Sequence, residues 1–372
     1  MRGIVAFHLG AGNHSEKNRA SYKALCYQAA QKVADDLSKG SSALDLVTEC
    51  TVLLENSPLT NAGIGSNLTT LGTVECDASV MEGSTCAMGA VGALSGVPNP
   101  VLVARSIALE QTNVQSSGRV MPCMLVGDGA LSFAQDRGIS TVDPASLITV
   151  QSQKTLRKCR RKLERYSVPP KTPSKLEHQT PIPIFTIEGC SNQSKKLKMA
   201  DDAEEDKKLD TVGAVAIDMN GESAASCSSG GVLIKLPGRV GQAGVVGAGC
   251  WAEGPVAVTV SGTGEDLLRT SLCKEVAQAI ISSNDLASTL VQTITKLFLE
   301  SKYLTMGSSK LCGVLAVKKD PEGGGELAWA HTTQSMAIGF ISSNFPSPKF
   351  QISRLPKSVA PGSSVNVQGV SW

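Results

Sequence analysis

The sequence has few aromatic side chains and almost no excess of charge. Phenylalanine, tryptophan and tyrosine together make up 4% of its 372 residues, whereas 36 residues are glycine. We therefore expect a core of small aliphatic side chains, with backbone segments that approach one another closely. Lysine and arginine number 35 against 33 aspartates and glutamates. Such a balance does not by itself imply a nucleic-acid or membrane partner.

Long apolar runs and metal-ligand patterns are also lacking. No stretch approaches the roughly 18 consecutive apolar residues that predict a membrane span. The apolar run at the N-terminus breaks at Gly10, so we expect a buried strand there rather than a signal peptide or an anchor. The four histidines lack the spacing of zinc ligands, and neither a metal nor a cofactor is expected. The 11 cysteines include no Cys-x-x-Cys pair, which predicts mostly buried, reduced thiols in an intracellular protein.

Apolar periodicity divides the chain into two ordered parts. Before residue 150 it predicts a strand at 4–9, a turn at 10–12, helices at 22–37 and 42–54, glycine-rich loops at 61–72, and a strand, turn and helix within 90–109. After residue 210 it predicts strands at 211–218, 222–229, 245–250, 256–260, 312–317 and 337–341, and helices at 266–283 and 286–298. Hairpin strands followed by helices favour a layered α+β architecture over a doubly wound sheet.

The segment between the two parts, residues 151–208, differs in composition. Lys154–Arg165 holds seven basic residues and one acid, prolines follow, and a second basic group, Lys195–Lys198, precedes an acidic run. This composition is typical of a mobile, solvated insertion, in which Lys154–Arg165 could form a helix although little of it is apolar enough to be buried. The two basic groups together resemble a nuclear-localisation signal. The alternatives are a solvated loop without a partner, and direct nucleic-acid binding, which is disfavoured because few aromatic residues interleave with the charges.

Thr211 is the first residue of the predicted strand that follows the insertion. From its position alone, such a threonine is more often a good strand former than a reactive group. The strings Ser229-Gly230-Gly231, Gly238-Arg239 and Ser261-Gly262 lie in the same half of the chain. They offer a hydroxyl, a guanidinium and backbone N–H donors, which are the groups that acyl transfer needs.

Five strings in chain order resemble the type-2 asparaginases, and most closely the threonine aspartase (taspase) branch of that family. These strings are Leu54–Pro58 running into Asn61–Ser66, Glu75–Gly83, Thr211–Val215, Ser229–Gly231 and Gly238–Gly241. The resemblance covers nearly everything outside the insertion. It implies one domain over residues 1–372, with the α+β, four-layer αββα sandwich of the N-terminal-nucleophile (Ntn) hydrolases.

The resemblance also implies that the precursor cuts itself between Asp210 and Thr211. The products would be an α subunit of residues 1–210 and a β subunit of residues 211–372, which stay packed together and pair into an (αβ)₂ dimer. The chemical reason is that the threonine hydroxyl needs a base to remove its proton, and the nearest one is the residue's own α-amine. A free α-amine has a pKa of about 7.7–8.0 and can accept the threonine proton near neutral pH, but only after the preceding peptide bond is gone.

Roles for individual residues follow from the same resemblance. Thr211 is the nucleophile, and its amine is the general base. Ser229 orients the amine or the hydroxyl of Thr211, while Ser261 and Gly262 supply the oxyanion hole. Asn61 matches a first-half asparagine placed close to the nucleophile, although an ordinary turn residue is the alternative for this position.

One departure from the asparaginases bears on specificity. In those enzymes Gly-Arg-Val-Gly is followed by an aspartate, and the arginine and aspartate hold the α-carboxylate and the α-ammonium of the substrate. This chain keeps Arg239 but has Gln242 at the second position. A substrate whose nitrogen lies in a peptide bond needs no anion there, and Arg239 could then bind an aspartate side chain, as Asp210 offers at the junction. The pattern therefore predicts a threonine endopeptidase that cuts after aspartate.

Taspase-like enzymes process nuclear regulators such as trithorax-type histone methyltransferases and the precursor of a general transcription factor. The resemblance thus implies protein substrates of that class and a location in the nucleus and cytoplasm, without a membrane or direct nucleic-acid partner. Two alternatives remain: a type-2 asparaginase or isoaspartyl peptidase, and a catalytically silent nuclear scaffold. Glu75 and Asp77 could suggest a glycosidase carboxylate pair, but their position in a glycine-rich stretch favours a structural role.

Overall fold

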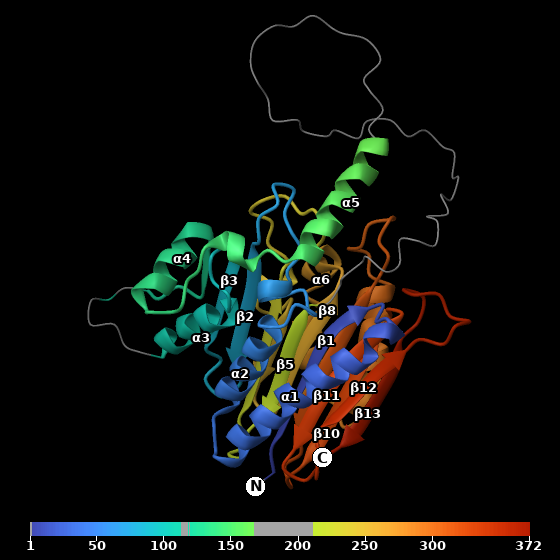
Figure 1. Ribbon diagram of the computed structural model, residues 1–372. Helices are drawn as coiled ribbons and strands as arrows, with labels where there is room; N and C mark the ends of the chain where they lie inside the picture. The colour runs from blue at the N-terminus through green and yellow to red at the C-terminus, as the bar shows by residue number, and fades with distance from the viewer. Residues whose placement is uncertain (1, 113–117, 119, 167–210) are drawn as a thin grey trace, which may run out of the picture.

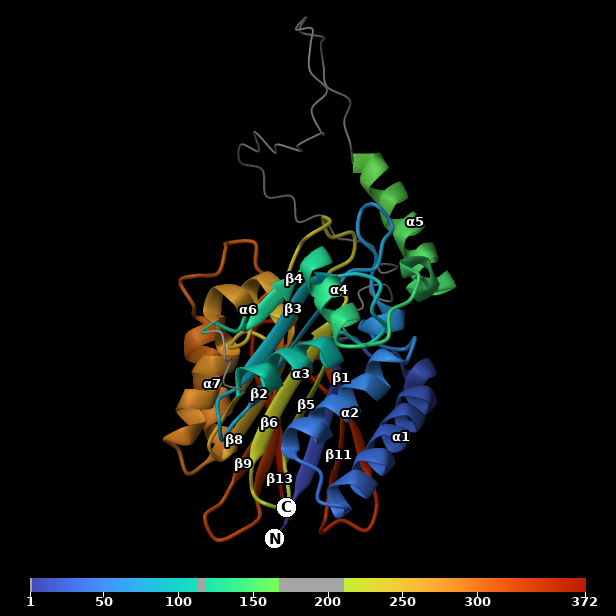
Figure 2. The same ribbon diagram turned by 90° about the vertical axis from the view of Figure 1, so that its left-hand side faces the viewer.

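Two β-sheets lie face to face, with helices on both outer faces (Figures 1 and 2). The computed structural model of the chain describes residues 2–112, 118, 120–166 and 211–372. The large sheet has eight strands, in the order β12 (Lys349–Arg354), β11 (Ser335–Ser342), β1 (Ile4–Gly12), β5 (Val212–Ile217), β6 (Ser223–Ser229), β2 (Cys76–Glu82), β3 (Met88–Leu94) and β4 (Met124–Val126). Neighbouring strands are antiparallel except β3 and β4, which are parallel.

The small sheet has five antiparallel strands, in the order β13 (Asn366–Ser371), β10 (Gly325–His331), β9 (Cys312–Lys319), β8 (Val256–Gly262) and β7 (Cys250–Glu253). The helices of the first half are α1 (Arg19–Ser38), α2 (Ala43–Glu55), α3 (Pro100–Gln111), α4 (Gly127–Asp136) and α5 (Val150–Tyr166). Those of the second half are α6 (Gly264–Thr270), α7 (Leu272–Ile281) and α8 (Leu286–Ile294). The mixed α+β class predicted from the hairpin pattern is confirmed.

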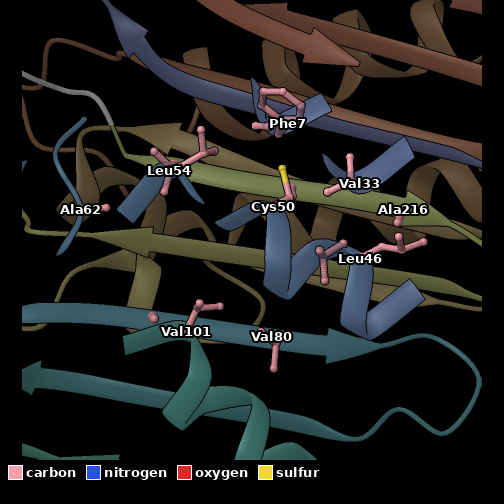
Figure 3. Packing of buried hydrophobic residues seen from close by; sticks show 14 of the residues in the cluster. Phe7, Val33, Leu46, Cys50, Leu54, Ala62, Val80, Val101 and Ala216 are labelled. Carbon is pink, nitrogen blue, oxygen red and sulfur yellow. The ribbon is translucent and has the colours of Figure 1, made fainter. Parts of the chain in front are cut away.

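Alternate side chains of the central strands enter two different cores. In β5, Val212, Ala214 and Ala216 pack with residues of α1, α2 and α3, while Val215 and Ile217 pack between the two sheets. Figure 3 shows the first of these cores, with Leu46 and Cys50 of α2 among the residues of the neighbouring strands. A third core joins α7 and α8 to the outer face of the small sheet. Because strand side chains alternate, a strand buried on both faces reads as a continuous apolar run.

Several predicted elements hold, and others need correction. Helices 22–37 and 42–54 correspond to α1 and α2, and the hairpin at 211–229 corresponds to β5 and β6. The predicted turn at 10–12 is wrong, because β1 continues to Gly12 through a bulge at which Gly10 has a φ of 99°. The predicted strand at 245–250 is also wrong, since Gly247 has a φ of 89° and the chain turns there.

The later helices and strands also depart from the prediction. The helix predicted at 266–283 is two helices, because Ser271 adopts the left-handed region with a φ of 46°. The helix predicted at 286–298 ends at Ile294 and continues as a π-helix, Thr295–Leu299. Six strands within the described ranges escaped prediction: β2, β4, β7, β10, β12 and β13. Every cysteine in the described ranges is a free thiol, but Cys86 and Cys123 are exposed.

The start of the predicted insertion is ordered. Residues 150–166 form α5, which leaves the body of the molecule at one end (Figures 1 and 2). Leu156 is buried against a small cluster that includes Leu68 and Val74, and the guanidinium of Arg160 donates to the carbonyl oxygen of Thr70 at 2.5 Å. One face of α5 is thus anchored, contrary to a wholly mobile insertion. Residues 167–208 lie outside the described ranges.

No helix within the described ranges has the length and apolar character needed to cross a membrane.

Candidate active site

The centre of the large sheet places Thr211 beside Ser229. Thr211 immediately precedes β5, Ser229 ends β6, and the register pairs Val212 with Ser228. The Thr211 hydroxyl donates to the Ser229 hydroxyl oxygen at 2.9 Å. Both residues are buried. The hairpin therefore brings the two predicted hydroxyl residues together.

A small cavity of about 10 Å³, roughly the space of one water molecule, lies next to this pair. Its lining residues are Asn61, Thr211, Ser229, Gly231, Val232, Arg239, Gln242, Gly262 and Gly264. Ser261 is buried one residue before Gly262 and does not line the cavity. Asp210, the other residue of the predicted junction, lies outside the described ranges. The remaining predicted site residues thus meet at one place, although they come from distant parts of the chain.

The hydroxyl of Thr211 has defined partners on two sides. The Ser229 hydroxyl oxygen accepts the hydrogen bond from the Thr211 hydroxyl and a second hydrogen bond from the backbone N–H of Gly231 at 3.0 Å. The side-chain amide of Gln242 points at Thr211 with a distance of 3.4 Å from Nε2 to Oγ1. An amide can donate to a hydroxyl oxygen, whereas an ionised carboxylate can only accept. Gln242 therefore supports the nucleophile's oxygen in a way that an aspartate could not.

Arg239 is already engaged with a carboxylate. Its Nε and Nη2 atoms donate to Oε1 of Glu265 at 3.0 and 2.8 Å. The Arg239 side chain is 14% exposed and that of Glu265 is 51% exposed. The sequence reading missed Glu265, although its place directly after the Ser-Gly-Thr-Gly string, in the first turn of α6, was an available signal.

Glycines enclose the guanidinium of Arg239. A Cβ atom on Gly231 or Gly241 would lie 2.8 or 2.4 Å from Nη1, and one on Gly264 would lie 2.5 Å from Nη2. Real Cβ contacts are longer than this, so a side chain at any of these positions would displace the guanidinium. The glycine strings that suggested close backbone approach thus form the slot that holds Arg239.

Asn61 joins the first half of the chain to the cavity. Its side-chain amide donates to the carbonyl oxygen of Gly231 at 2.8 Å, and its Oδ1 accepts from the backbone N–H of Asn67 at 2.9 Å. Its backbone oxygen accepts from the N–H of Gly230 at 2.7 Å. These contacts fix the loop that follows Ser229. A part for Asn61 in the reaction itself stays a prediction.

Ser261 and Gly262 end strand β8. The Ser261 hydroxyl oxygen accepts from the backbone N–H of Ala11 at 3.1 Å, which ties β8 to β1. Gly262 has a φ of 143°, and a Cβ there would lie 2.3 Å from the carbonyl oxygen of Leu311. This position therefore requires glycine. An oxyanion hole built from these two residues stays a prediction.

Asp77 and Glu75 support the loop that carries Arg239. Asp77 is buried and accepts from the N–H of Gly241 at 2.8 Å through Oδ2. Burial raises the pKa of its carboxyl group, and the nearby ammonium of Lys235 opposes that rise. Glu75 accepts from the N–H of Gly238 at 2.8 Å, and its carbonyl oxygen accepts from Lys235. These contacts agree with the structural role expected for both carboxylates.

The described residues contain no group of three or more histidine, cysteine, aspartate or glutamate side chains arranged to hold a metal ion.

Known proteins resemble this chain over most of its length. The family model described as Asparaginase matches residues 1–347. An isoaspartyl peptidase of Escherichia coli K12 is 34% identical over 341 residues, which cover 90% of this chain and 91% of that protein. An isoaspartyl peptidase of Salmonella typhimurium is 37% identical over 282 residues, covering 74% and 78%. An isoaspartyl peptidase/L-asparaginase of Mus musculus is 34% identical over 276 residues, covering 73% and 70%.

Proposed function

Since the chain belongs to the type-2 asparaginase family, we propose that it is a self-activating hydrolase with Thr211 as its N-terminal nucleophile. The observation that carries the proposal is the hydroxyl pair of Thr211 and Ser229 on the wall of a cavity that also contains Arg239. The αββα sandwich of the Ntn hydrolases is the fold that this activity requires, and the two stacked sheets with outer helices agree with it. Thr211 also follows in sequence the segment of unusual composition, residues 151–208, with Leu209 and Asp210 between them.

Activation is proposed to proceed through an ester. The Thr211 hydroxyl oxygen attacks the carbonyl carbon of Asp210, the hydroxyl proton passes to the departing nitrogen, and the acyl group moves from nitrogen to oxygen. Water then hydrolyses the ester, which leaves a carboxylate on Asp210 and a free amine on Thr211. In the uncut chain the Ser229 hydroxyl oxygen accepts a hydrogen bond from the Thr211 hydroxyl. This hydrogen bond orients the attacking lone pair of the Thr211 oxygen.

Turnover repeats this chemistry with a substrate. The new α-amine accepts the Thr211 proton, the oxygen forms an acyl-enzyme with the substrate carbonyl, and the leaving amine takes the proton. Water, deprotonated by the same amine, then releases the acyl group. An amine with a pKa of about 7.7–8.0 is partly unprotonated at neutral pH and can serve both steps.

For the substrate we propose a peptide bond that follows an aspartate. The two contacts with Glu265 use Nε and Nη2 of Arg239, and no contact recorded among the described residues uses Nη1. Nη1 lies nearest the cavity glycine Gly231 and can meet a carboxylate there. Gln242 supplies no negative charge for a free α-ammonium. An endopeptidase of the threonine aspartase kind fits these two side chains.

A second candidate has direct support from the relatives. The proteins of Escherichia coli and Salmonella typhimurium are named isoaspartyl peptidases, and the mouse protein is named an isoaspartyl peptidase/L-asparaginase. The relatives therefore favour a β-aspartyl dipeptide or asparagine as substrate, whereas the cavity side chains favour a peptide. In this second case Glu265 would have to receive the α-ammonium of the substrate, since it is the carboxylate that contacts Arg239.

One substrate panel separates the two candidates. The purified, self-cleaved protein is assayed with a blocked peptide containing an internal Asp-Gly bond, the same peptide with Asn-Gly, a β-aspartyl dipeptide, and L-asparagine. Cleavage of the Asp-Gly peptide alone supports the endopeptidase. Turnover of the two small substrates without peptide cleavage replaces it with the second candidate. A Thr211→Ala chain that still cuts itself or any substrate would refute both, and a silent wild type would leave the scaffold alternative.

We also propose that the enzyme acts on nuclear regulatory proteins after import through its basic segment. Lys154, Arg157 and Arg161 are exposed on α5, and this charge supports the idea, while Lys195–Lys198 lies outside the described ranges. Replacement of Lys195, Lys196 and Lys198 by alanine in a fluorescent fusion should shift the protein from the nucleus toward the cytoplasm. Unchanged nuclear accumulation, with the α5 arginines also replaced, would contradict the proposal.

A further inference from the structure

Thr211 stands just beyond the ordered ladders of the central sheet. The β1–β5 ladder runs from the Ile4–Ile217 pair to the His8–Gly213 pair, and the β5–β6 ladder reaches the Val212–Ser228 pair. Thr211 therefore lies just outside both ladders, immediately before the first paired residues of β5. Once the chain is cut before Thr211, this residue also becomes a chain end, and its position depends on the few contacts that it makes itself.

His8 meets Thr211 where the β1–β5 ladder stops. Burial lowers the pKa of His8, and an interaction of its imidazole with the backbone of Thr211 opposes that fall, as an approach of a ring N–H to a carbonyl oxygen does. Nδ1 of His8 accepts from the backbone N–H of Gly10 at 3.3 Å. In a neutral ring the proton must then be on Nε2. Nε2 is therefore the atom that can donate to the carbonyl of Thr211.

The surroundings keep the ring in this place. A Cβ atom on Gly213 would lie 2.7 Å from Nε2 of His8 and 2.1 Å from Oγ1 of Thr259. Thr259 donates to the carbonyl oxygen of Ser226 at 2.8 Å and presents its oxygen to Nε2 of His8 at 3.5 Å. The glycine two residues after Thr211 thus leaves the space that the ring and the Thr259 hydroxyl fill.

The ring stays neutral over the range in which the enzyme works. His8 is fully buried, and burial, helped by the proximity of His14, lowers its pKa to about 3. A neutral imidazole with a fixed tautomer donates one hydrogen bond at every pH from about 5 to 9. His8 is therefore suited to hold a backbone group, and it is not suited to exchange protons with the nucleophile.

We propose that His8 is a positioning residue that holds the carbonyl group of Thr211 and thereby fixes the amine and hydroxyl of the N-terminal threonine against each other. The amine can take the hydroxyl proton only if the backbone of Thr211 does not rotate, and the carbonyl is the backbone group of Thr211 that stays covalently attached to β5 after the cut. The inference rests on the proposed function, because it assigns His8 to the same nucleophile.

Two substitutions of His8 test the proposal in the full-length chain. His8→Leu removes the donor and fills the space with an apolar side chain, while His8→Gln keeps an N–H donor. We expect His8→Leu to slow self-cleavage and to lower kcat by about 10- to 100-fold, with KM changed by less than about 3-fold, because misplacement of a reacting group acts on the chemical step. His8→Gln should recover most of that loss.

His331 provides the matched control. It is also buried, burial also lowers its pKa, to about 4, and it bonds to Thr333 and Ser353 on a different part of the protein. His331→Leu should lower the melting temperature by a similar amount as His8→Leu and leave kcat near the wild-type value. If His8→Leu keeps the wild-type kcat, if only KM changes, or if His331→Leu loses kcat equally, the proposal is wrong while Thr211 can remain the nucleophile.

A spectroscopic measurement tests the contact without any activity. The chain has four histidines, so selective ¹⁵N labelling gives few ring signals, and the His8→Gln variant assigns those of His8. We expect the neutral tautomer with its proton on Nε2, unchanged from pH 5 to pH 9. A proton on Nδ1, or a ring that titrates in this range, would overturn the proposal even if the chain proved to have no hydrolase activity.

Discussion

At the scale of single residues, the side chain at position 242 distinguishes the two candidate substrates, because only one of them carries a free α-ammonium. Its amide faces the Thr211 hydroxyl from within the cavity, at the position where the resemblance to the asparaginases leads one to expect a carboxylate. Aspartate and asparagine have nearly the same shape, so a pair of substitutions at this position compares a carboxylate with an amide of equal size. The carboxylate adds a negative charge and removes the N–H donor.

We predict that Gln242→Asp raises kcat/KM for a β-aspartyl dipeptide by about 10- to 100-fold relative to Gln242→Asn. The reason is that a hydrogen bond to a charged group contributes about 1.5–3 kcal/mol, and at position 242 the aspartate offers this to a free α-ammonium as an ion pair whereas the asparagine does not. Steady-state kinetics on both self-cleaved variants provide the measurement. Equal values for the two variants would show that the substrate ammonium is bound elsewhere.

Glu55 is a buried carboxyl group with consequences for stability. It accepts from the Ser228 hydroxyl at 2.6 Å, and burial raises its pKa to about 8 against hydrogen bonds that lower it. The folded state therefore retains a proton that the unfolded state loses near pH 4.5. The stabilisation due to this group is complete below about pH 4.5 and is lost as the pH rises through about 8, by a few kcal/mol in total.

We predict that Glu55→Gln removes this loss, so that the free energy of unfolding changes less between pH 5 and pH 8 than in the parent chain. Urea unfolding at several pH values measures the slope, and a Thr211→Ala background keeps the chain whole. Glu49→Gln, a change of a partly exposed carboxyl in the same helix, should keep the parent slope. Parallel curves for Glu55→Gln and its parent would contradict the shifted pKa.

At the scale of elements, the strands and helices that could be predicted from the sequence were those that are buried and bounded by glycine-containing turns. The hairpin of β5 and β6 was predictable because both strands are apolar or small throughout and a Met-Asn-Gly turn joins them. By contrast, β12 and β13 end their sheets and are partly exposed, so their side chains show little apolar pattern. The break at Ser271 had no glycine to mark it. Motif strings located most cavity residues, but the contact between Arg239 and Glu265 depends on how the Arg239 loop meets the start of α6.

In helix α5 the charged composition allowed a helix but did not reveal its anchor, the buried side chain of Leu156. We predict that Leu156→Ala increases hydrogen exchange in residues 150–166 by about 30-fold or more, since removing a buried leucine costs about 2–5 kcal/mol. Leu163→Ala, on the half-exposed side, is the matched control and should change exchange little. Unchanged exchange in Leu156→Ala would mean that other contacts hold the helix.

At the scale of the whole molecule, the proposed cut divides the large sheet, in which strands of the two products are interleaved. Strand β1 of the first half lies between β11 and β5 of the second half, and β2 pairs with β6. Neither product owns the complete large sheet or the two cores that pack against it, whereas the small sheet and the core beneath α7 and α8 come from the second half alone. The cut therefore divides the large sheet and leaves the small sheet in one product.

We predict that the self-cleaved protein behaves as one particle. Native mass spectrometry should show both fragments in one complex, and dilution to nanomolar concentration should not separate them, because separation would break the large sheet and expose the cores on its two faces. Denaturing mass spectrometry of the same sample should show two chains, the second beginning at Thr211. Fragments that separate in native buffer would show that the central strands do not hold the halves together.

The interleaved strands change the molecularity of folding. The precursor folds as one chain, at a rate independent of concentration, and the pairing of β1 with β5 is then an intramolecular event. After the cut, unfolding still starts from a single particle, but refolding requires two separate chains to meet and to insert strands between each other's strands. A denatured mature enzyme should therefore recover poorly on dilution, whereas the uncut chain recovers well. Maturation in this protein would then be a one-way step for folding as well as for the peptide bond.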